Sequence, residues 1–254
     1  ALFVINHAHA GTTIIEATGQ VPTSGFGSTI AVDNDLMAVS CEHYEYDNSV
    51  TVYHHDGSEW NIEEQITRLI SSSPIHQNLA VDGIIALDQG QLAISAGQST
   101  PFGQTVNAMI YERQTYTSIP EWVPHASLST GNPNATVNAI AFTNDLVILS
   151  ITNNYGPSNF IATFDRNATP YPYIPMRHQI QAPNPSDIVN FGSSIATDGA
   201  LLAVSGYDNS TGRAAIFLFE VTSGGYALIN TIVSPINSSN SFFQRAVGFD
   251  NGRI

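Results

Sequence analysis

A serine returns at a fixed interval of 55 residues along this chain, and this spacing restricts its fold more than any other feature. The four copies are Ser40, Ser95, Ser150 and Ser205. Each copy ends a short apolar run: Leu-Met-Ala-Val-Ser, Leu-Ala-Ile-Ser, Val-Ile-Leu-Ser and Leu-Ala-Val-Ser. Four copies at one spacing predict a repeat architecture, in which one supersecondary unit is stacked several times.

The clearest copy, Phe191–Val233, contains four segments with the composition of β-strands. Each segment is rich in β-branched or aromatic residues and is bounded by Gly, Asn, Asp or Ser. No stretch shows a helical period, and the turns are short, so we expect an antiparallel meander. The two middle strands are apolar on both faces, so neighbouring sheets must cover this sheet on both sides. Four-stranded sheets stacked face to face predict an all-β fold, a β-propeller.

The repeat divides the chain into about five blades of a single propeller. The expected units are a partial blade 1–21, blades 22–76, 77–131, 132–186 and 187–238, and a partial blade 239–254. Two interpretations remain open at this point. The end pieces complete one split blade and close a five-bladed ring, or the chain is an excerpt of a longer array that closes at seven blades.

Two of the copies resemble the opening of an FG-GAP repeat. These are Phe26-Gly27-Ser28-Thr29-Ile30-Ala31-Val32-Asp33 and Phe191-Gly192-Ser193-Ser194-Ile195-Ala196-Thr197-Asp198. The similarity covers nearly the whole chain and is closest to the short-hairpin type of this family, with integrin α chains more distant. The second and third repeats lack Phe-Gly, and the Gly-Ala-Pro that follows the second strand in the family is replaced throughout. The resemblance implies a propeller of a microbial or cell-surface protein.

The charge balance excludes several classes of function. The chain has a net charge of −14, with seven Arg and no Lys. A P-loop or a Schiff-base lysine is therefore excluded, and the acidic surface argues against a nucleic-acid partner. Cys41 is the single cysteine, so no disulfide framework holds the fold. No apolar run is long enough to span a membrane.

Four sites match the N-glycosylation pattern Asn-X-Ser/Thr: Asn134, Asn167, Asn209 and Asn237. All four fall in expected loops between strands, where a glycan has room. Together with the family resemblance, they favour a secreted or cell-surface protein.

We expect no metal ion and no cofactor. Acidic residues recur at the first hairpin of each repeat and would gather on one rim: Asp33, Asp88, Asp145, Asp198 and Asp250. Integrin-type repeats bind calcium at this hairpin, but calcium needs 6–8 oxygen ligands and the hairpins here are too short to supply them. Asx turns that close tight hairpins explain these residues better. His54 and His55 would point to opposite faces of a strand and could not chelate together.

Aromatic residues mark two further positions in the repeat. Trp60, Trp122 and Tyr226 begin the fourth strands, where we expect them to pack the outer strand on the next blade. The loops joining second to third strands carry a second set, which the resemblance to FG-GAP propellers places on the partner-binding face. These candidate ligand-binding residues are His43, Tyr44, Tyr46, Phe102, Tyr155 and Tyr207. The alternative is that each ring holds its own loop against the sheet.

The sequence therefore predicts an extracellular, non-enzymatic binding or scaffold module for a protein or glycan ligand. A purely structural repeat of a larger surface assembly is the alternative. A propeller hydrolase is less favoured, because the first strands carry Gly, Ser, Thr, Ala and Ile, with Arg245 as the one charged exception. No catalytic residue is expected.

Overall fold

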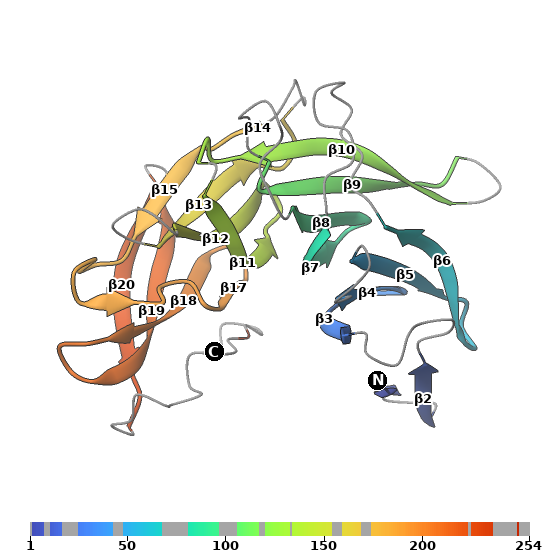
Figure 1. Cartoon of the computed structure of the whole chain (residues 1–254), viewed down its shortest axis with the longest axis horizontal. Coiled ribbons are helices and arrows are strands. Elements are labelled where there is room, and N and C mark those ends of the chain that lie inside the picture. The colour runs from blue at the N-terminus through green and yellow to red at the C-terminus, as the bar shows by residue number, and fades with distance from the viewer. Residues whose placement is uncertain are drawn as a thin grey trace.

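The protein folds as a series of antiparallel β-sheets in the computed structural model (Figure 1). The structure describes residues 2–7, 11–16, 25–42, 48–67, 81–96, 106–116, 120–132, 134–153, 159–168, 174–222, 225–235 and 248. No helix occurs among these residues, and hence none that could cross a membrane. The all-β class predicted from the repeat is confirmed.

Four successive sheets follow one another along the chain. The first contains β3 (Gly25–Asp33), β4 (Leu36–Glu42), β5 (Ser49–His55) and β6 (Trp60–Ile66). The second contains β7 (Val81–Asp88), β8 (Gln91–Ala96), β9 (Ala108–Gln114) and β10 (Glu121–Ser129). The third contains β11 (Ala135–Phe142), β12 (Leu146–Asn153), β13 (Phe160–Asp165) and β15 (His178–Gln181). The fourth contains β16 (Ile188–Val189), β17 (Ile195–Thr197), β18 (Leu201–Asp208), β19 (Arg213–Thr222) and β20 (Gly225–Val233).

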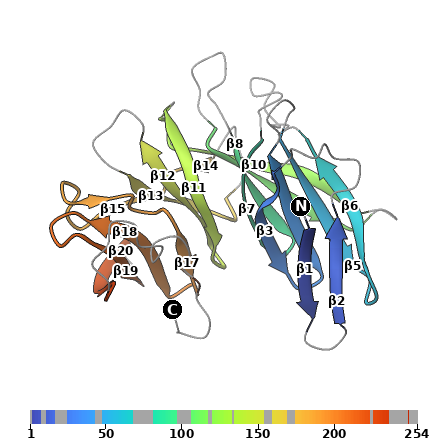
Figure 2. The same cartoon turned by 60° about the horizontal axis from the view of Figure 1, so that its bottom comes forward.

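These sheets fan out into an arch whose inner side is formed by the first strands, β3, β7, β11 and β17 (Figure 1). The fourth strands, β6, β10, β15 and β20, lie on the outer side. A separate hairpin of β1 (Leu2–His7) and β2 (Gly11–Glu16) lies at the β3–β6 end of the stack in both views (Figures 1 and 2). The described strands form this arch and no closed ring.

Apolar cores lie between neighbouring sheets, as the two apolar faces of each middle strand require. Leu36 and Val52 of the first sheet pack with Leu92 and Met109 of the second. The opposite face of the second sheet packs on the third through another set of buried side chains: Ala93, Ile110, Leu128, Val147, Leu149 and Phe164. A third core joins the third and fourth sheets through a similar set of buried side chains: Ile148, Ile161, Phe191, Val204, Phe217 and Phe219. The second and third sheets are thus each buried on both faces.

All four repeating serines lie in second strands and are fully buried, which confirms their predicted equivalence. In three sheets the hydroxyl accepts a hydrogen bond from a backbone N–H eleven residues earlier, in or just before the first strand. The donors are Thr29, Ile84 and Ser194, at 2.9, 3.0 and 2.8 Å respectively. This bond satisfies an amide where the register shifts or the first strand begins, which explains why a small hydroxyl residue recurs there.

Two features depart from a simple meander. β14 (Ile174–Pro175) follows the third strand of the third repeat but pairs in parallel with β10 of the second sheet. The first strand of the fourth repeat is divided into β16 and β17, because Asn190 and Gly192 both have positive φ values, 52° and 84°. Gly192 lies so close to the third sheet that a Cβ there would overlap Ser150 Oγ.

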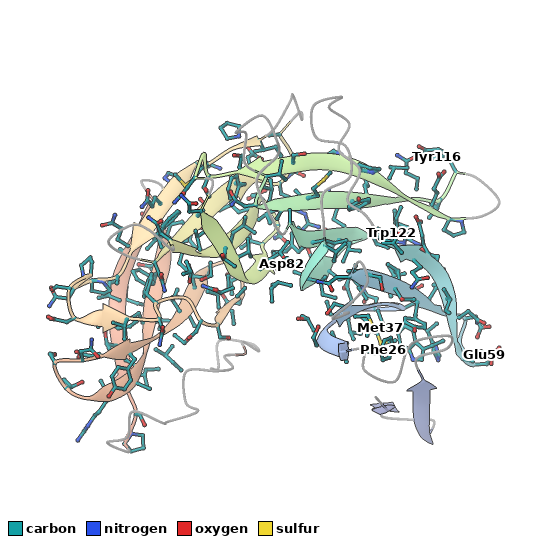
Figure 3. The ribbon with its side chains drawn as sticks, viewed as in Figure 1. Phe26, Met37, Glu59, Asp82, Tyr116 and Trp122 are labelled. Carbon is teal, nitrogen blue, oxygen red and sulfur yellow. The ribbon has the colours of Figure 1, made fainter. Side chains whose placement is uncertain are left out.

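The aromatic residues of the fourth strands pack in the direction opposite to the prediction. Trp122 is buried in the core shared with the preceding sheet, beside Ile66 of β6. Tyr226 likewise packs against the core shared with the third sheet, and Trp60 against the face of its own sheet turned away from the second. Figure 3 shows Trp122 beside β6, with Phe26 and Met37 together in the first sheet. Periodicity alone does not reveal which face of a strand meets which neighbour, so the direction was not predictable.

Candidate functional site

In the part of the chain that the structure describes, two cavities lie along the first strands on the inner side of the arch, one toward each end of the strands. One cavity lies where these strands begin and is lined mainly by neutral polar side chains. The other lies where they end, at the first hairpins, beside mostly aliphatic residues whose exposed surface there is more polar than apolar. A concave surface with a few convergent polar groups is the usual form of a small-molecule site, so the polar cavity is the candidate site.

The polar cavity has a volume of about 410 Å³. It is lined by Ile84, Val137, Asn138, Thr152, Asn159, Asn190 and Ser193. Three sheets contribute to this lining, because β7, β11 and the segment before β17 all approach the inner side of the arch at this level. Three amides and two hydroxyls therefore face a space shared by three repeats.

Asn138 occupies the point of β11 where the register with β12 shifts, between Val137 and Ala139. Its Nδ2 donates a hydrogen bond of 2.6 Å to Thr152 Oγ1 on β12. A β-bulge changes the direction in which a side chain of the strand points. The bond to Thr152 then holds the Asn138 amide in position. The pair gives the cavity a fixed polar wall, rather than two side chains free to rotate.

The amides of the lining retain unused hydrogen-bonding capacity. An asparagine side chain has two N–H donors and a carbonyl acceptor. Asn138 uses one donor on Thr152, and the side chains of Asn159 and Asn190 make no hydrogen bond to any other residue that the structure describes. Ser193 Oγ contacts Ser205 Oγ at 3.0 Å. The lining can thus both donate to and accept from a neutral ligand, and no acid or base is among its residues.

The opposite end of the first strands is a network of satisfied polar groups. Asp33 accepts a hydrogen bond of 2.6 Å from the Gln89 amide of the next repeat. Asp88 in turn pairs with the buried Arg166 of the third repeat, which also donates to Thr143 O at 2.9 Å. Asp198 accepts from the two following amides, Ala200 and Leu201, at 3.0 and 2.8 Å. Asp198 therefore closes its hairpin as the predicted Asx turn, whereas Asp33 and Asp88 join neighbouring repeats. In the third repeat, Thr143 Oγ1 accepts the turn amides in place of Asp145, and Asp250 lies outside the described residues.

Most of the predicted loop-face residues cannot be placed. His43, Tyr44, Tyr46, Phe102 and Tyr155 lie outside the described residues. Tyr207 lies in β18, half-buried and paired with Val189 and Ala214, rather than in a loop as predicted. The strand continues past Tyr207 because Asp208 closes a tight turn before Arg213, so the polar segment that suggested a long loop is mostly paired. Of the six residues, Tyr207 alone lies in the part of the chain that the structure describes.

The glycosylation candidates lie where the sequence placed them, in the part that the structure describes. Asn134, Asn167 and Asn209 are exposed residues of turns, and Asn237 lies outside the described residues. The Asn167 amide donates to Asp165 Oδ1 at 3.0 Å, and the Asn134 amide donates to Asn132 Oδ1 at the same distance. All three side chains are therefore accessible on well-formed turns.

Two exposed turns hold an aspartate in its ionised form. Asp208 accepts hydrogen bonds from Ser210 Oγ at 2.6 Å and Thr211 Oγ1 at 3.0 Å, and these bonds lower its pKa below the usual value. Asp56 has a lowered pKa for the same reason, because Ser58 and the Glu59 amide donate to it. Burial raises the pKa of Tyr226 at the interface of the third and fourth sheets. None of these groups lines the polar cavity.

Sequence reasoning missed the polar cavity itself. The first strands were judged by their lack of acids and bases, and their neutral polar residues were passed over. A signal was nevertheless present, because Asn138 stands where the other repeats have the small residues Ser28, Gly83 and Ser193. Asn159 and Asn190 lie far from it in sequence, so only the stacking of sheets shows that the three amides converge.

No family model matches the chain, and no curated protein is similar to it. Among solved structures, the chain is similar to a prolyl endopeptidase from a study of two such enzymes and of their inter-domain dynamics. The TM-score is 0.54 and the sequence identity 13%, with 88% of this chain and 29% of that chain covered. The chain thus spans less than a third of that protein's length, and at this identity the match shows a likeness of fold alone.

Proposed function

We propose that the chain is a series of FG-GAP-like β-propeller blades that act as a non-enzymatic, extracellular module binding neutral, hydroxyl-rich ligands such as glycans. The observation that carries this proposal is the cavity at the start of the first strands, with Asn138 and Thr152 as its fixed polar wall. Neutral amides and hydroxyls match the donors and acceptors of sugar hydroxyls without the desolvation cost of a charge.

The stacking of four-stranded sheets supports the propeller. Three apolar cores join successive sheets, and the first strands share one inner side. The structural match points the same way, because prolyl endopeptidases contain a β-propeller domain. The arch is consistent with both interpretations of the repeat, a five-bladed ring completed by the end pieces and part of a longer array.

Three exposed asparagines in glycosylation motifs support the extracellular location. The uncharged lining of the polar cavity supports binding without catalysis. General acid–base and nucleophilic catalysis need a titratable or activated group within hydrogen-bond reach of the substrate. The residues lining the cavity supply amides, hydroxyls and apolar groups instead. A glycan would therefore meet a surface that can orient it, and the described residues of the lining include no acid or base to cleave it.

The test is a glycan array probed with the purified chain, followed by calorimetric titration of the best neutral oligosaccharide. We expect Asn138→Leu to weaken binding at least tenfold, since it removes the amide and orphans Thr152. The matched control is Asn144→Ala, an exposed asparagine of the hairpin at the other end of β11, which should bind as the parent does. Equal loss in both variants, or hydrolysis of the bound glycan, would contradict the proposal.

A structural role in a larger surface assembly is the second candidate. The outer strand of the fourth sheet favours it, because Leu228, Ile229, Ile232 and Val233 are each between 37% and 50% exposed. Exposed apolar residues grouped on one strand are typical of a surface that another domain covers. Failure to bind any glycan, together with self-association that Ile229→Glu abolishes, would favour this role over the first.

A further inference from the structure

β20 is the outermost strand of the fourth sheet, and one of its edges is unpaired in the part of the chain that the structure describes. The order of strands ends at β20, which pairs with β19 alone. Every residue from Ala227 to Val233 is exposed, and Figure 1 shows the strand on the outer side of the arch. An edge strand presents backbone N–H and C=O groups with which another strand can pair.

The hydrogen-bond register identifies the backbone groups that point to this open edge. The Ser234 amide, one residue beyond the strand, donates to Ala214 O of β19 at 2.8 Å. In an antiparallel ladder, successive residues direct their N–H and C=O groups alternately toward one neighbouring strand and away from it. The backbone of Ile232 therefore faces β19, as that of Ser234 does. The N–H and C=O groups of Thr231 and Val233 point outward.

The other fourth strands are protected against further pairing. β6 carries Glu63 and Glu64, β15 has only four residues, and the edge of β10 is already paired with β14. Charges, short strands and covering segments are the usual means of protecting an edge. β20 has none of these, because its nine residues include no charged side chain and no proline.

The pairing of β10 shows that a fourth strand of this fold accepts an additional strand. Both β10 and β20 contain a register shift, which leaves His125 and Ile229 respectively as the extra residue. β14 begins its pairing at Leu128, three residues beyond His125. The same position in β20 is Ile232, so the open edge lies where the second sheet already accommodates an added strand.

Two exposed apolar side chains of β20 do not owe their exposure to the end of the series of sheets. Leu228 and Val233 pair with Phe219 and Ala215, so they lie on the face toward the third sheet. They are exposed there because β15, the strand of the third sheet that contacts β20, has four residues against nine. A strand added at the edge of β20 would cover part of this apolar surface as well.

We propose that β20 pairs with β20 of a second copy of the chain, antiparallel and about a two-fold axis, so that two fourth sheets become one continuous sheet. The partner strand needs an unpaired and uncharged edge of its own, and β20 is the fourth strand of this chain that has one. In a two-fold contact, each copy closes the open edge of the other. The net charge of −14 opposes association, but β20 brings no like charges together.

Hydrogen exchange at increasing protein concentration tests the pairing without any substitution. We expect a weak dimer, with a dissociation constant of about 10–100 μM, because one strand from each copy makes a smaller contact than a standard interface. As the dimer forms, exchange of the Thr231 and Val233 amides should slow at least tenfold, while that of Ile232, already bonded to β19, changes little. Unchanged exchange where sedimentation velocity detects a dimer would overturn the proposal, and so would a monomer at millimolar concentration.

A proline placed at the open edge blocks the pairing selectively. Thr231→Pro removes an outward N–H without removing a hydrogen bond to β19, and an edge strand tolerates proline at such a position. We expect this variant to stay monomeric, while its circular dichroism and melting temperature report that the fold persists. Thr231→Val keeps the N–H and should dimerise as the parent does. A dimer that persists in Thr231→Pro uses another surface and would contradict the proposal.

Salt distinguishes this contact from one held by ion pairs. Because the paired strands are uncharged and the two copies repel each other, added salt should strengthen the dimer by screening that repulsion. A dimer that salt weakens would contradict the proposal.

An extended segment like β14 is the alternative occupant of the edge. The peptide Pro-Tyr-Ile-Pro-Met, copied from residues 172–176, serves as its probe. A chain that stays monomeric while this peptide protects the Thr231 and Val233 amides would assign the edge to such a segment and overturn the dimer. β20 does not line the polar cavity, and glycan binding is measured separately at Asn138. Failure of either proposal therefore leaves the other one intact.

Discussion

The third repeat differs from the other three at the serine on which the repeat is built. Ser40, Ser95 and Ser205 each accept a hydrogen bond from an amide of the same repeat, eleven residues before them. Ser150 instead donates to Gly192 O of the fourth repeat at 2.5 Å. The equivalent serine therefore bonds within its own sheet in three repeats, and in the third repeat it bonds across the interface to the fourth.

This difference accompanies the polar cavity. In the third repeat the shifted position of the first strand carries Asn138, whose amide bonds to Thr152 and lines the cavity. Gly192 brings the fourth repeat close to Ser150, so that Asn190 and Ser193 reach the same space. The third repeat, whose serine bonds differently from the other three, therefore also carries part of the candidate site. Departures from a regular pattern are common at functional sites.

The largest expected effect is that of Gly192→Ala. Its φ of 84° is unfavourable for a side chain, and the added Cβ would overlap Ser150 Oγ and lie 2.9 Å from Ile161 Cδ1. We expect a loss of roughly 2–5 kcal/mol in the free energy of unfolding, from strain and overpacking together. Urea titration measures it.

Gly199→Ala is the matched control for this substitution. Its φ of 93° is similar, but a Cβ there meets nothing within 4 Å. It should lower the free energy of unfolding only by the strain of a side chain in this backbone conformation, about 1–2 kcal/mol. Equal losses in the two variants would show that close approach to the third repeat is not what requires Gly192.

The interface of the first two sheets provides a contrast, because a charged pair joins them in addition to their apolar core. Arg113 binds Glu63 through two hydrogen bonds, of 2.8 and 2.5 Å, and Glu63 also accepts from Trp122 Nε1 at 2.8 Å. Arg113→Met leaves Glu63 without its cation, and we expect unfolding to become easier by roughly 2–4 kcal/mol, since the Arg113 side chain is 16% exposed.

A double-mutant cycle sharpens this contrast. Adding Glu63→Gln to Arg113→Met removes the orphaned charge, so the double variant should recover part of the stability lost in the single one. Chemical denaturation of the four proteins measures the coupling. Strictly additive losses would mean that Arg113 acts by packing alone.

A smaller effect distinguishes the serines themselves. Ser205→Ala leaves the Ser194 amide without its acceptor and should cost about 1–2 kcal/mol. Ser150→Ala should lower the free energy of unfolding by a similar amount. It should also reduce the loss of stability caused by Gly192→Ala, because it removes Ser150 Oγ, the atom nearest to the added Cβ. We expect coupling of about 1 kcal/mol between positions 150 and 192, and none between 40 and 192, which lie in different sheets.

The smallest expected effect concerns Asp208 on the exposed turn of the fourth repeat. Its lowered pKa means that the folded state favours the carboxylate, so the associated stability is present above the usual aspartate pKa and is lost as the pH falls through the lowered value. Carboxyl NMR titration should find this pKa below that of Asp208 in Ser210→Ala. An identical pKa in both proteins would show that the Ser210 hydroxyl does not hold it.

The sequence predicted the strands, the serine positions and the stacking of apolar faces, because these follow from periods of 2 and 55 residues. It did not predict which face of β10 receives Trp122, or that Arg166 would join Asp88 from the next repeat. Such contacts depend on the rotation between neighbouring sheets, which no local pattern encodes. The convergence of Asn138, Asn159 and Asn190 was hidden for the same reason, since they come from different repeats or different strands.

The most direct test of this account follows the side-chain amides of asparagine by NMR while a neutral oligosaccharide from the glycan array is added. The account predicts that the amide signals of Asn138, Asn159 and Asn190 shift together and saturate at one affinity, while those of Asn144 and Asn209 stay in place. Shifts confined to the exposed turns, with the three cavity amides unchanged at saturation, would contradict it.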